Sequence, residues 1–188
     1  MKKNTKKIVT AAGIAAGTAA VASLSAYVTI KALIDTALDR EMPKVMEKAD
    51  KRISGEKSSD EFTNRMESAS ESLAVQPNET VEIIAHDGEK LVGHYFPCEK
   101  PERVIIAFHG WRSAWHRDFG MISDFWYKNN CSVLYVEQRG QNNSSGEYMG
   151  FGLTERFDCL DWLNWEIERC GSDIPAVSYT HLTLPTIL

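Results

Sequence analysis

The sequence predicts an α/β fold in which a mostly parallel sheet carries helices on both faces. Two apolar runs, at residues 104–108 and 133–136, show no alternation of apolar and polar side chains. Such runs are typical of strands that are buried on both faces of a parallel sheet. An amphipathic segment follows each run, at residues 118–128 and 154–169. Strands that alternate with helices along a chain favour parallel pairing through crossover helices.

Two further strand patterns flank this unit. Residues 80–85 and 90–96 are rich in strand-forming side chains, and the Asp87-Gly88 turn signal between them predicts a β-hairpin. After the second helix, residues 174–177 are expected to begin a third buried strand. Thr154 is a candidate N-cap of that helix, and Gly171 follows its end.

The N-terminal segment has the pattern of a membrane anchor. Residues 8–30 are uncharged, and a helix of that length is able to cross the hydrocarbon core. Four lysines precede this run, which predicts a single-pass protein in the cell membrane, with its N-terminus in the cytoplasm and the rest outside. A secreted protein is the alternative, because Ser23-Leu24-Ser25 could form a signal-cleavage site.

The remaining chain divides by composition. Residues 31–76 carry 8 basic and 10 acidic side chains and predict a charged helical connector after the anchor at residues 1–30. Thin apolar stripes suggest helices in residues 45–53 and 62–73, with Asp60 as a cap of the second. Residues 77–176 are expected to form the folded domain.

Composition also bears on partners and cofactors. The net charge is −5, without a basic patch interleaved with aromatic side chains, so we expect no nucleic-acid partner. Four cysteines are present without a CxxC pair, and the sequence therefore gives no reason to expect a metal or another cofactor.

One motif stands where the first buried strand meets a loop, at Phe108-His109-Gly110-Trp111. Here the chain resembles the α/β-hydrolase family, in which a His-Gly-x motif after this strand builds part of the oxyanion hole. The resemblance implies that the backbone N–H of Trp111 is the oxyanion donor, and that His109 and Gly110 shape the loop.

A second segment extends the resemblance. Residues 137–148 follow the next strand and are similar to the R-G-x-G-x-S-x-G loop of these hydrolases, although Gln141, Asn142 and Asn143 replace the usual small residues. The helix at residues 154–169 continues the similarity, in particular to serine-aminopeptidase-like and acyl-peptidase-like bacterial hydrolases. The resemblance covers residues 79–176.

The family's nucleophile is expected after the strand that begins at Ile174, in a Gly-x-Ser-x-Gly elbow. This sequence contains no such motif, and residues 177–188 are uncharged and resemble a non-native tail. We therefore expect a truncated fold that lacks the nucleophile, the acid and the histidine, so that the fragment has no catalytic residue of its own and is inactive.

For the full-length parent, the resemblance implies a serine hydrolase that cleaves an ester or amide bond in a small molecule or peptide. One alternative is an aspartate nucleophile on the same fold, which would open epoxides or haloalkanes. The other is a binding module that kept the fold without catalysis.

Overall fold

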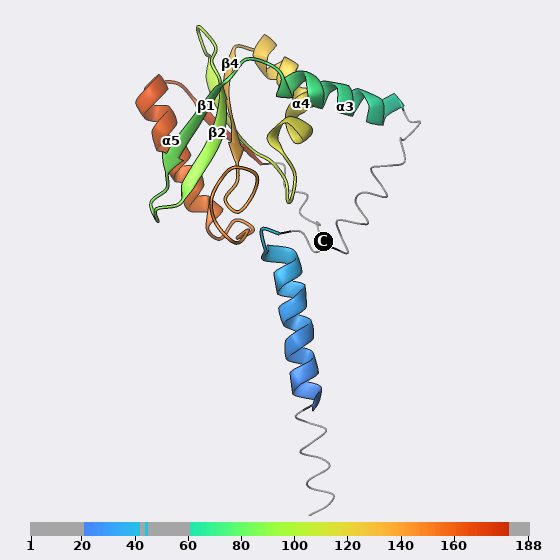
Figure 1. The fold of residues 1–188 in the computed structure, drawn as a ribbon. Helices are drawn as coiled ribbons and strands as arrows, with labels where there is room; N and C mark the ends of the chain where they lie inside the picture. The colour runs from blue at the N-terminus through green and yellow to red at the C-terminus, as the bar shows by residue number, and fades with distance from the viewer. Residues whose placement is uncertain (1–20, 42–43, 45–60, 181–188) are drawn as a thin grey trace, which may run out of the picture. The chain divides into compact units, whose positions relative to one another are not determined.

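The computed structural model describes residues 21–41, 44 and 61–180 (Figure 1). The chain divides into two compact units, Met1–Asp39 and Arg40–Leu188. The first contains a helix, Val21–Leu38, that is long and apolar enough to cross a membrane, with a mean hydropathy of 1.4 and none of its residues buried. A signal sequence near an N-terminus would have the same properties.

This helix does not end where the uncharged run ends. It continues past Ile30 through Lys31 and Asp35, whose side chains form an i, i+4 ion pair at 2.7 Å. Residues 8–20 of the predicted anchor lie outside the described residues. The division of the chain at residues 30, 76 and 176 stays a prediction.

The second unit is built on a five-stranded sheet in the order β1-β2-β4-β3-β5. Strand β2 pairs antiparallel with β1 and β4, whereas β3 pairs parallel with β4 and β5, so the sheet is mixed. The strand bounds are Glu79–Ile84 (β1), Lys90–Phe96 (β2), Arg103–Phe108 (β3), Cys131–Glu137 (β4) and Ala176–Thr180 (β5).

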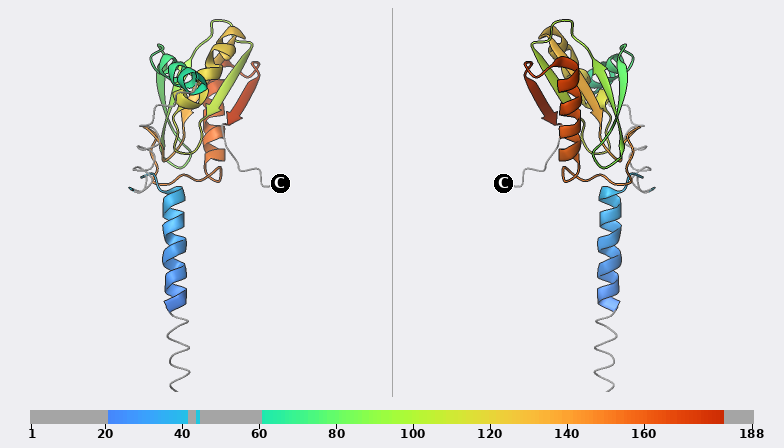
Figure 2. Two further views of the ribbon diagram at one scale, coloured as in Figure 1. Left: turned by 90° about the vertical axis from the view of Figure 1, so that its right-hand side faces the viewer. Right: turned by 90° about the vertical axis from the view of Figure 1, so that its left-hand side faces the viewer.

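Helices cover both faces of this sheet, as the sequence predicts (Figures 1 and 2). Because side chains alternate along a strand, Ile105 and Ala107 of β3 pack with α4 (Trp115–Lys128), while Ile106 and Phe108 pack with Trp162 of α5 (Glu155–Cys170). The described helices of this unit that lie beside the sheet are α3 (Glu61–Ala74), α4 (Trp115–Lys128) and α5 (Glu155–Cys170).

Helix α3, from the charged segment, packs closely on α4. Leu73 is 1% exposed and belongs to the core on the α4 face. A Cβ at Gly120 of α4 would lie 2.7 Å from backbone atoms of Ala69 and Ser70 in α3, so the two helices touch where Gly120 has no side chain. The predicted cap Asp60 and the predicted helix at 45–53 lie outside the described residues.

Three local expectations need correction. Helix α4 begins at Trp115 rather than Asp118. Thr154 stands at the N-cap of α5, but its side chain makes no capping hydrogen bond. The third buried strand, β5, is exposed at all five residues, because it pairs only with β3 in the described part of the chain, although Tyr179 contacts Phe119 and Trp126 of α4.

Candidate functional site

The predicted oxyanion loop begins at the carboxyl end of β3. Phe108, the last residue of β3, pairs with Val136 of β4 and with Thr180 of β5. The carboxyl ends of three parallel strands therefore meet beside residues 109–114. In open α/β sheets, ligands bind at this edge.

Side chains from two sides hold the loop in place. The Asp118 carboxylate accepts the Gly110 N–H at 2.6 Å and the Ser113 hydroxyl at 2.6 Å. Gln141, from the loop after β4, accepts the Arg112 N–H at 2.8 Å. Arg112 has a φ of 51°, in the left-handed region, so these contacts hold a conformation that a non-glycine residue rarely adopts.

His109 is fully buried and hydrogen-bonded on both ring nitrogens. Its Nδ1 lies 2.9 Å from the Gly110 carbonyl, which assigns the proton to Nδ1. Nε2 then accepts the Gln138 N–H at 3.3 Å and the Asn142 amide at 3.1 Å. Burial lowers the pKa of His109 below its ordinary value, in keeping with a neutral ring. This ring supports the loop and has no open nitrogen for proton transfer.

A buried carboxylate organises the loop after β4. Glu137 is 2% exposed, and it accepts hydrogen bonds from Asn143 N–H at 2.6 Å and from His94 Nε2 at 2.8 Å. Burial raises the pKa of Glu137, but the hydrogen bonds from His94 and Asn143 outweigh it, so the pKa of Glu137 lies below its ordinary value. Ser144 Oγ donates to the Glu137 carbonyl and accepts the Val92 N–H, which fastens this loop to β2.

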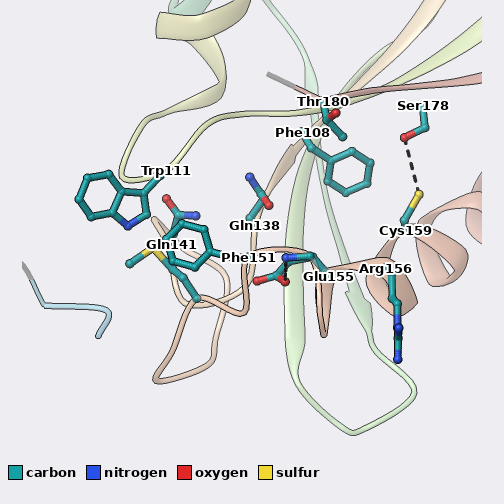
Figure 3. Close-up of a pocket in the computed structure, with 12 residues that line it drawn as sticks. Phe108, Trp111, Gln138, Gln141, Phe151, Glu155, Arg156, Cys159, Ser178 and Thr180 are labelled. Carbon is teal, nitrogen blue, oxygen red and sulfur yellow. Dashed lines mark hydrogen bonds between the residues drawn. The ribbon is translucent and has the colours of Figure 1, made fainter. Parts of the chain in front are cut away.

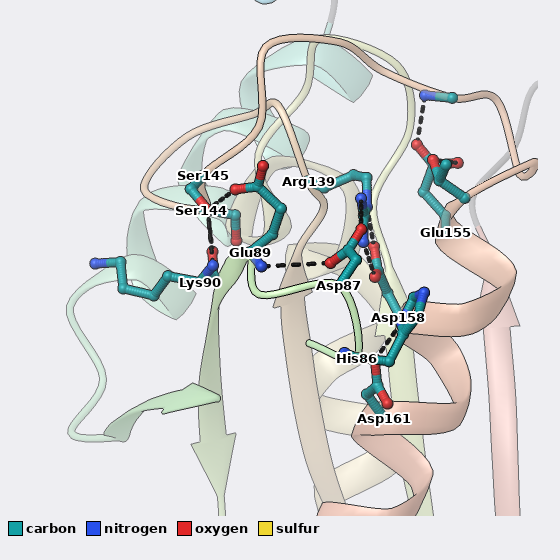
Figure 4. A network of polar contacts seen from close by, with 12 residues as sticks. His86, Asp87, Glu89, Lys90, Arg139, Ser144, Ser145, Glu155, Asp158 and Asp161 are labelled. Atoms are coloured by element: carbon teal, nitrogen blue, oxygen red, sulfur yellow. Dashed lines mark hydrogen bonds and ion pairs between the residues drawn. The ribbon is translucent and has the colours of Figure 1, made fainter. Parts of the chain in front are cut away.

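Arg139 joins three elements by ion pairs (Figure 4). Its guanidinium donates two hydrogen bonds to Asp158 of α5 and one, at 2.7 Å, to Asp87 of the hairpin turn. The paired aspartates raise the pKa of Arg139, with Asp158 as the largest cause. Arg139 is thus a structural residue that fixes the second loop against α5.

A pocket of about 230 Å³ opens at the same edge of the sheet (Figure 3). Trp111 and Phe151 stand on one side of it, while Cys159 and Ser178 lie on the other. Glu155 lies below, and its carboxylate accepts the N–H groups of Gly150 and Gly152 at 2.6 and 2.7 Å. The lining combines aromatic side chains and Met149 with polar ones, but its exposed surface is mainly apolar, which suits an apolar ligand group.

One group of described residues brings metal-ligand types together: His86, Asp158 and Asp161. Both carboxylate oxygens of Asp158 accept hydrogen bonds from Arg139, and Asp161 accepts from His86. These ligand atoms are already used within the protein, so the group gives no support for a metal centre.

Of the predicted residues, Trp111 lines the pocket and is 40% exposed, whereas His109 and Gly110 are buried in the loop before it. The role of the Trp111 N–H as a donor stays a prediction. Asp118, Gln141 and Glu137 were not predicted as supports of the loops, because their partners cannot be read from spacing alone.

Comparison with known proteins finds similarity in structure. No family model and no curated protein matches the sequence. DcsB, solved with a substrate analogue, is 14% identical with a TM-score of 0.50, over 55% of this chain and 36% of its own. The Pyrococcus furiosus esterase Pf2001 is 24% identical with a TM-score of 0.49, over 57% of this chain and 42% of its own. The α/β hydrolase GrgF from Penicillium is 18% identical with a TM-score of 0.47, over 56% and 37%.

The chain shares part of its fold with DcsB. It spans about two fifths of the length of the solved hydrolases that it matches. The described residues provide the hairpin, three parallel strands and the loop after β3.

Proposed function

We propose that this chain belongs to a serine hydrolase that cleaves an ester or amide bond, with the backbone N–H of Trp111 as an oxyanion donor. Serine would attack the carbonyl carbon, a histidine would remove the serine proton, and the Trp111 N–H would stabilise the charge on the carbonyl oxygen. His109 and Gly110 shape the loop and take no part in proton transfer.

The parallel pairing of β3 with β5, which begins with Val104 opposite Ala176, is the observation that supports this proposal best. Neighbouring strands lie about 4.8 Å apart. A nucleophile on a turn directly after β5 would therefore stand next to the loop at residues 109–111, where an attacked carbonyl could reach both. This is the arrangement that a nucleophile elbow and its oxyanion hole require.

The pocket supports an apolar group on the substrate. Phe108, Met149 and Phe151 contribute to its wall, and the charged end of Glu155 is occupied by backbone N–H groups. An ester with an aliphatic or aromatic acyl group fits this lining better than a strongly charged substrate does.

A fluorophosphonate probe tests the proposal. The chain of 188 residues should remain unlabelled and should not hydrolyse p-nitrophenyl esters. The hydroxyl of Ser70 lies 2.9 Å from His116 Nδ1, so labelling at Ser70 would reveal a different nucleophile and contradict the assignment. The gene product extended beyond β5 should be labelled at one serine. Epoxide opening without labelling would indicate an aspartate nucleophile. If the extended product shows neither labelling nor epoxide opening, the result would indicate a binding module.

We also propose that the N-terminal segment holds the hydrolase outside the cytoplasm. The apolar helix Val21–Leu38 and the four preceding lysines support this orientation. A reporter that is active only outside the cytoplasm, fused after Asp39, should be active and sediment with membranes. Replacement of the four lysines by glutamate is the control and should reduce reporter activity. A silent reporter in the unchanged sequence would contradict the orientation, and release into the medium would indicate cleavage.

A further inference from the structure

The peptide groups on both sides of Trp111 are fixed by side chains from outside the loop. Asp118 accepts the N–H of Gly110, and Gln141 accepts the N–H of Arg112. Gly110 therefore uses its hydrogen on Asp118 and cannot also donate to a bound oxyanion. With these two N–H groups anchored, the direction of the Trp111 peptide between them is set.

We propose that Asp118 is a positioning residue that aims the Trp111 N–H at the reacting carbonyl. This inference rests on the proposed function. Asp118 acts through the loop and does not touch the substrate. It holds the loop at two points, because its second oxygen accepts the Ser113 hydroxyl at 2.6 Å.

The location of Asp118 suits this role. It lies in the first turn of α4, where the helix dipole stabilises a negative charge. A short hydrogen bond from a backbone N–H to a carboxylate is stronger than one between neutral groups. Helix α4 is anchored in the core through Phe119, the next residue, which is fully buried. The loop is thereby tied to a rigid element.

Two substitutions separate positioning from a general effect on folding. In Asp118→Asn, the side-chain oxygen is able to accept the Gly110 N–H while the amide donates to Ser113 Oγ, so both contacts survive in neutral form. In Asp118→Ala, both contacts are lost. Ser113→Ala is the matched control, because it removes the second contact and leaves the Gly110 N–H bonded to Asp118.

Hydrogen exchange of the glycine amides measures the effect directly. The full chain, labelled with 15N-glycine and held in detergent micelles, gives signals from 12 glycines, among them Gly110 in the loop and Gly120 inside α4. Asp118→Ala should speed exchange at Gly110 by about ten- to hundredfold, since a hydrogen bond to a charged group contributes about 1.5–3 kcal/mol. Exchange at Gly120 should change by less than about threefold. In Asp118→Asn and Ser113→Ala, the exchange rate at Gly110 should stay closer to its value in the unchanged chain than it does in Asp118→Ala.

Unchanged exchange at Gly110 in Asp118→Ala would overturn the proposal, and so would an equal rise at Gly110 and Gly120, because the effect would then be general destabilisation. In the extended enzyme, Asp118→Ala should lower kcat with little change in KM, and Asp118→Asn should restore most of it. If Gly110 responds as expected but kcat does not, Asp118 holds the loop and the loop is not the oxyanion hole. The two measurements therefore distinguish a failure of the positioning role of Asp118 from a failure of the proposed function.

Discussion

At the scale of single residues, His109 shows why a histidine in a hydrolase motif need not be a base. Its imidazole is enclosed between the Gly110 carbonyl, the Gln138 N–H and the Asn142 amide. Each contact matches a neutral ring with its proton on Nδ1. A proton on Nε2 would oppose two donors, so the same network that orients the loop keeps His109 uncharged.

The neutral state of His109 predicts how stability depends on pH. Its pKa is lowered in the folded protein by burial, so below about pH 6.5 the unfolded chain binds a proton that the folded protein does not. Folding stability is therefore retained above this pH and falls as the pH drops from 7.5 to 5.5. The pKa of His116 is also lowered by burial and contributes in the same direction.

Thermal unfolding of His109→Gln at pH 7.5 and 5.5 checks this. The variant should lose about 1–3 kcal/mol of stability at pH 7.5, because buried partners lose hydrogen bonds. Its melting temperature should fall less between the two pH values than that of the unchanged chain. His116→Gln is the control for the more exposed histidine. If the melting temperature falls equally between the two pH values in His109→Gln and in the unchanged chain, His109 does not bind a proton on unfolding.

At this scale, the sequence could predict where the loop lies but not which side chains hold it. The His-Gly motif after an apolar strand was sufficient to locate the loop. The contacts of Gly110 with Asp118 and of Arg112 with Gln141 were beyond reach, because they depend on the left-handed turn at Arg112 and on the docking of a second loop.

At the scale of elements, the Arg139 ion pairs link the loop after β4 to α5 and to the hairpin turn. Arg139 and Asp158 have side chains that are only 8% and 3% exposed. Loss of one partner would leave the other charge buried without compensation. We therefore expect Arg139→Met to reduce the free energy of unfolding by about 3–5 kcal/mol.

Urea denaturation measures this change. The double variant Arg139→Met/Asp158→Leu should recover part of the loss, because neither buried charge remains. The exposed pair of Arg169 with Glu79 is the matched control, and Glu79→Gln should change stability by less than about 1 kcal/mol. Equal effects of Arg139→Met and Glu79→Gln would show that burial does not strengthen the Arg139 pairs.

The contact between α3 and α4 gives a second prediction for elements. Gly120→Ala would place a methyl group against the backbone of Ala69 and Ser70, where little movement is possible. We expect a loss of about 1–3 kcal/mol from overpacking and a looser α3. Trypsin should then cleave after Arg65, inside α3, faster than in the unchanged chain. Met121→Ala, at the exposed next position, is the control; equal cleavage in the two variants would show that α3 is not held at Gly120.

Apolar patterning predicted most strands and helices here because burial determines the pattern. The apolar runs in β3 and β4 and the Asp87-Gly88 turn were sufficient for the central strands and the hairpin. Pattern alone could not show that the hairpin joins the sheet through β2 and β4, or that α3 packs closely on α4 at Gly120. Both depend on contacts between elements that are distant in the sequence.

At the scale of the whole molecule, β5 is the edge of the described sheet. All five of its residues are exposed, and Val177–Thr180 belong to the segment that we expect to be non-native. Pairing with β3 uses backbone groups, which most residue types provide, so the presence of β5 does not test the origin of that segment. The proposed nucleophile belongs after this strand, and the complete enzyme is therefore the object on which the mechanism must be tested.

The most direct test compares Trp111→Ala and Trp111→Pro in the extended, active enzyme. The alanine variant keeps the backbone N–H, whereas proline removes it. Gly110 precedes the substituted position and has no Cβ to clash with the proline ring. Circular dichroism must show that both variants fold. We predict that Trp111→Ala retains substantial activity and that Trp111→Pro lowers kcat by about 10²–10³-fold, as expected for the loss of one oxyanion donor. A folded Trp111→Pro variant with an unchanged kcat would contradict the assignment of this loop as the oxyanion hole.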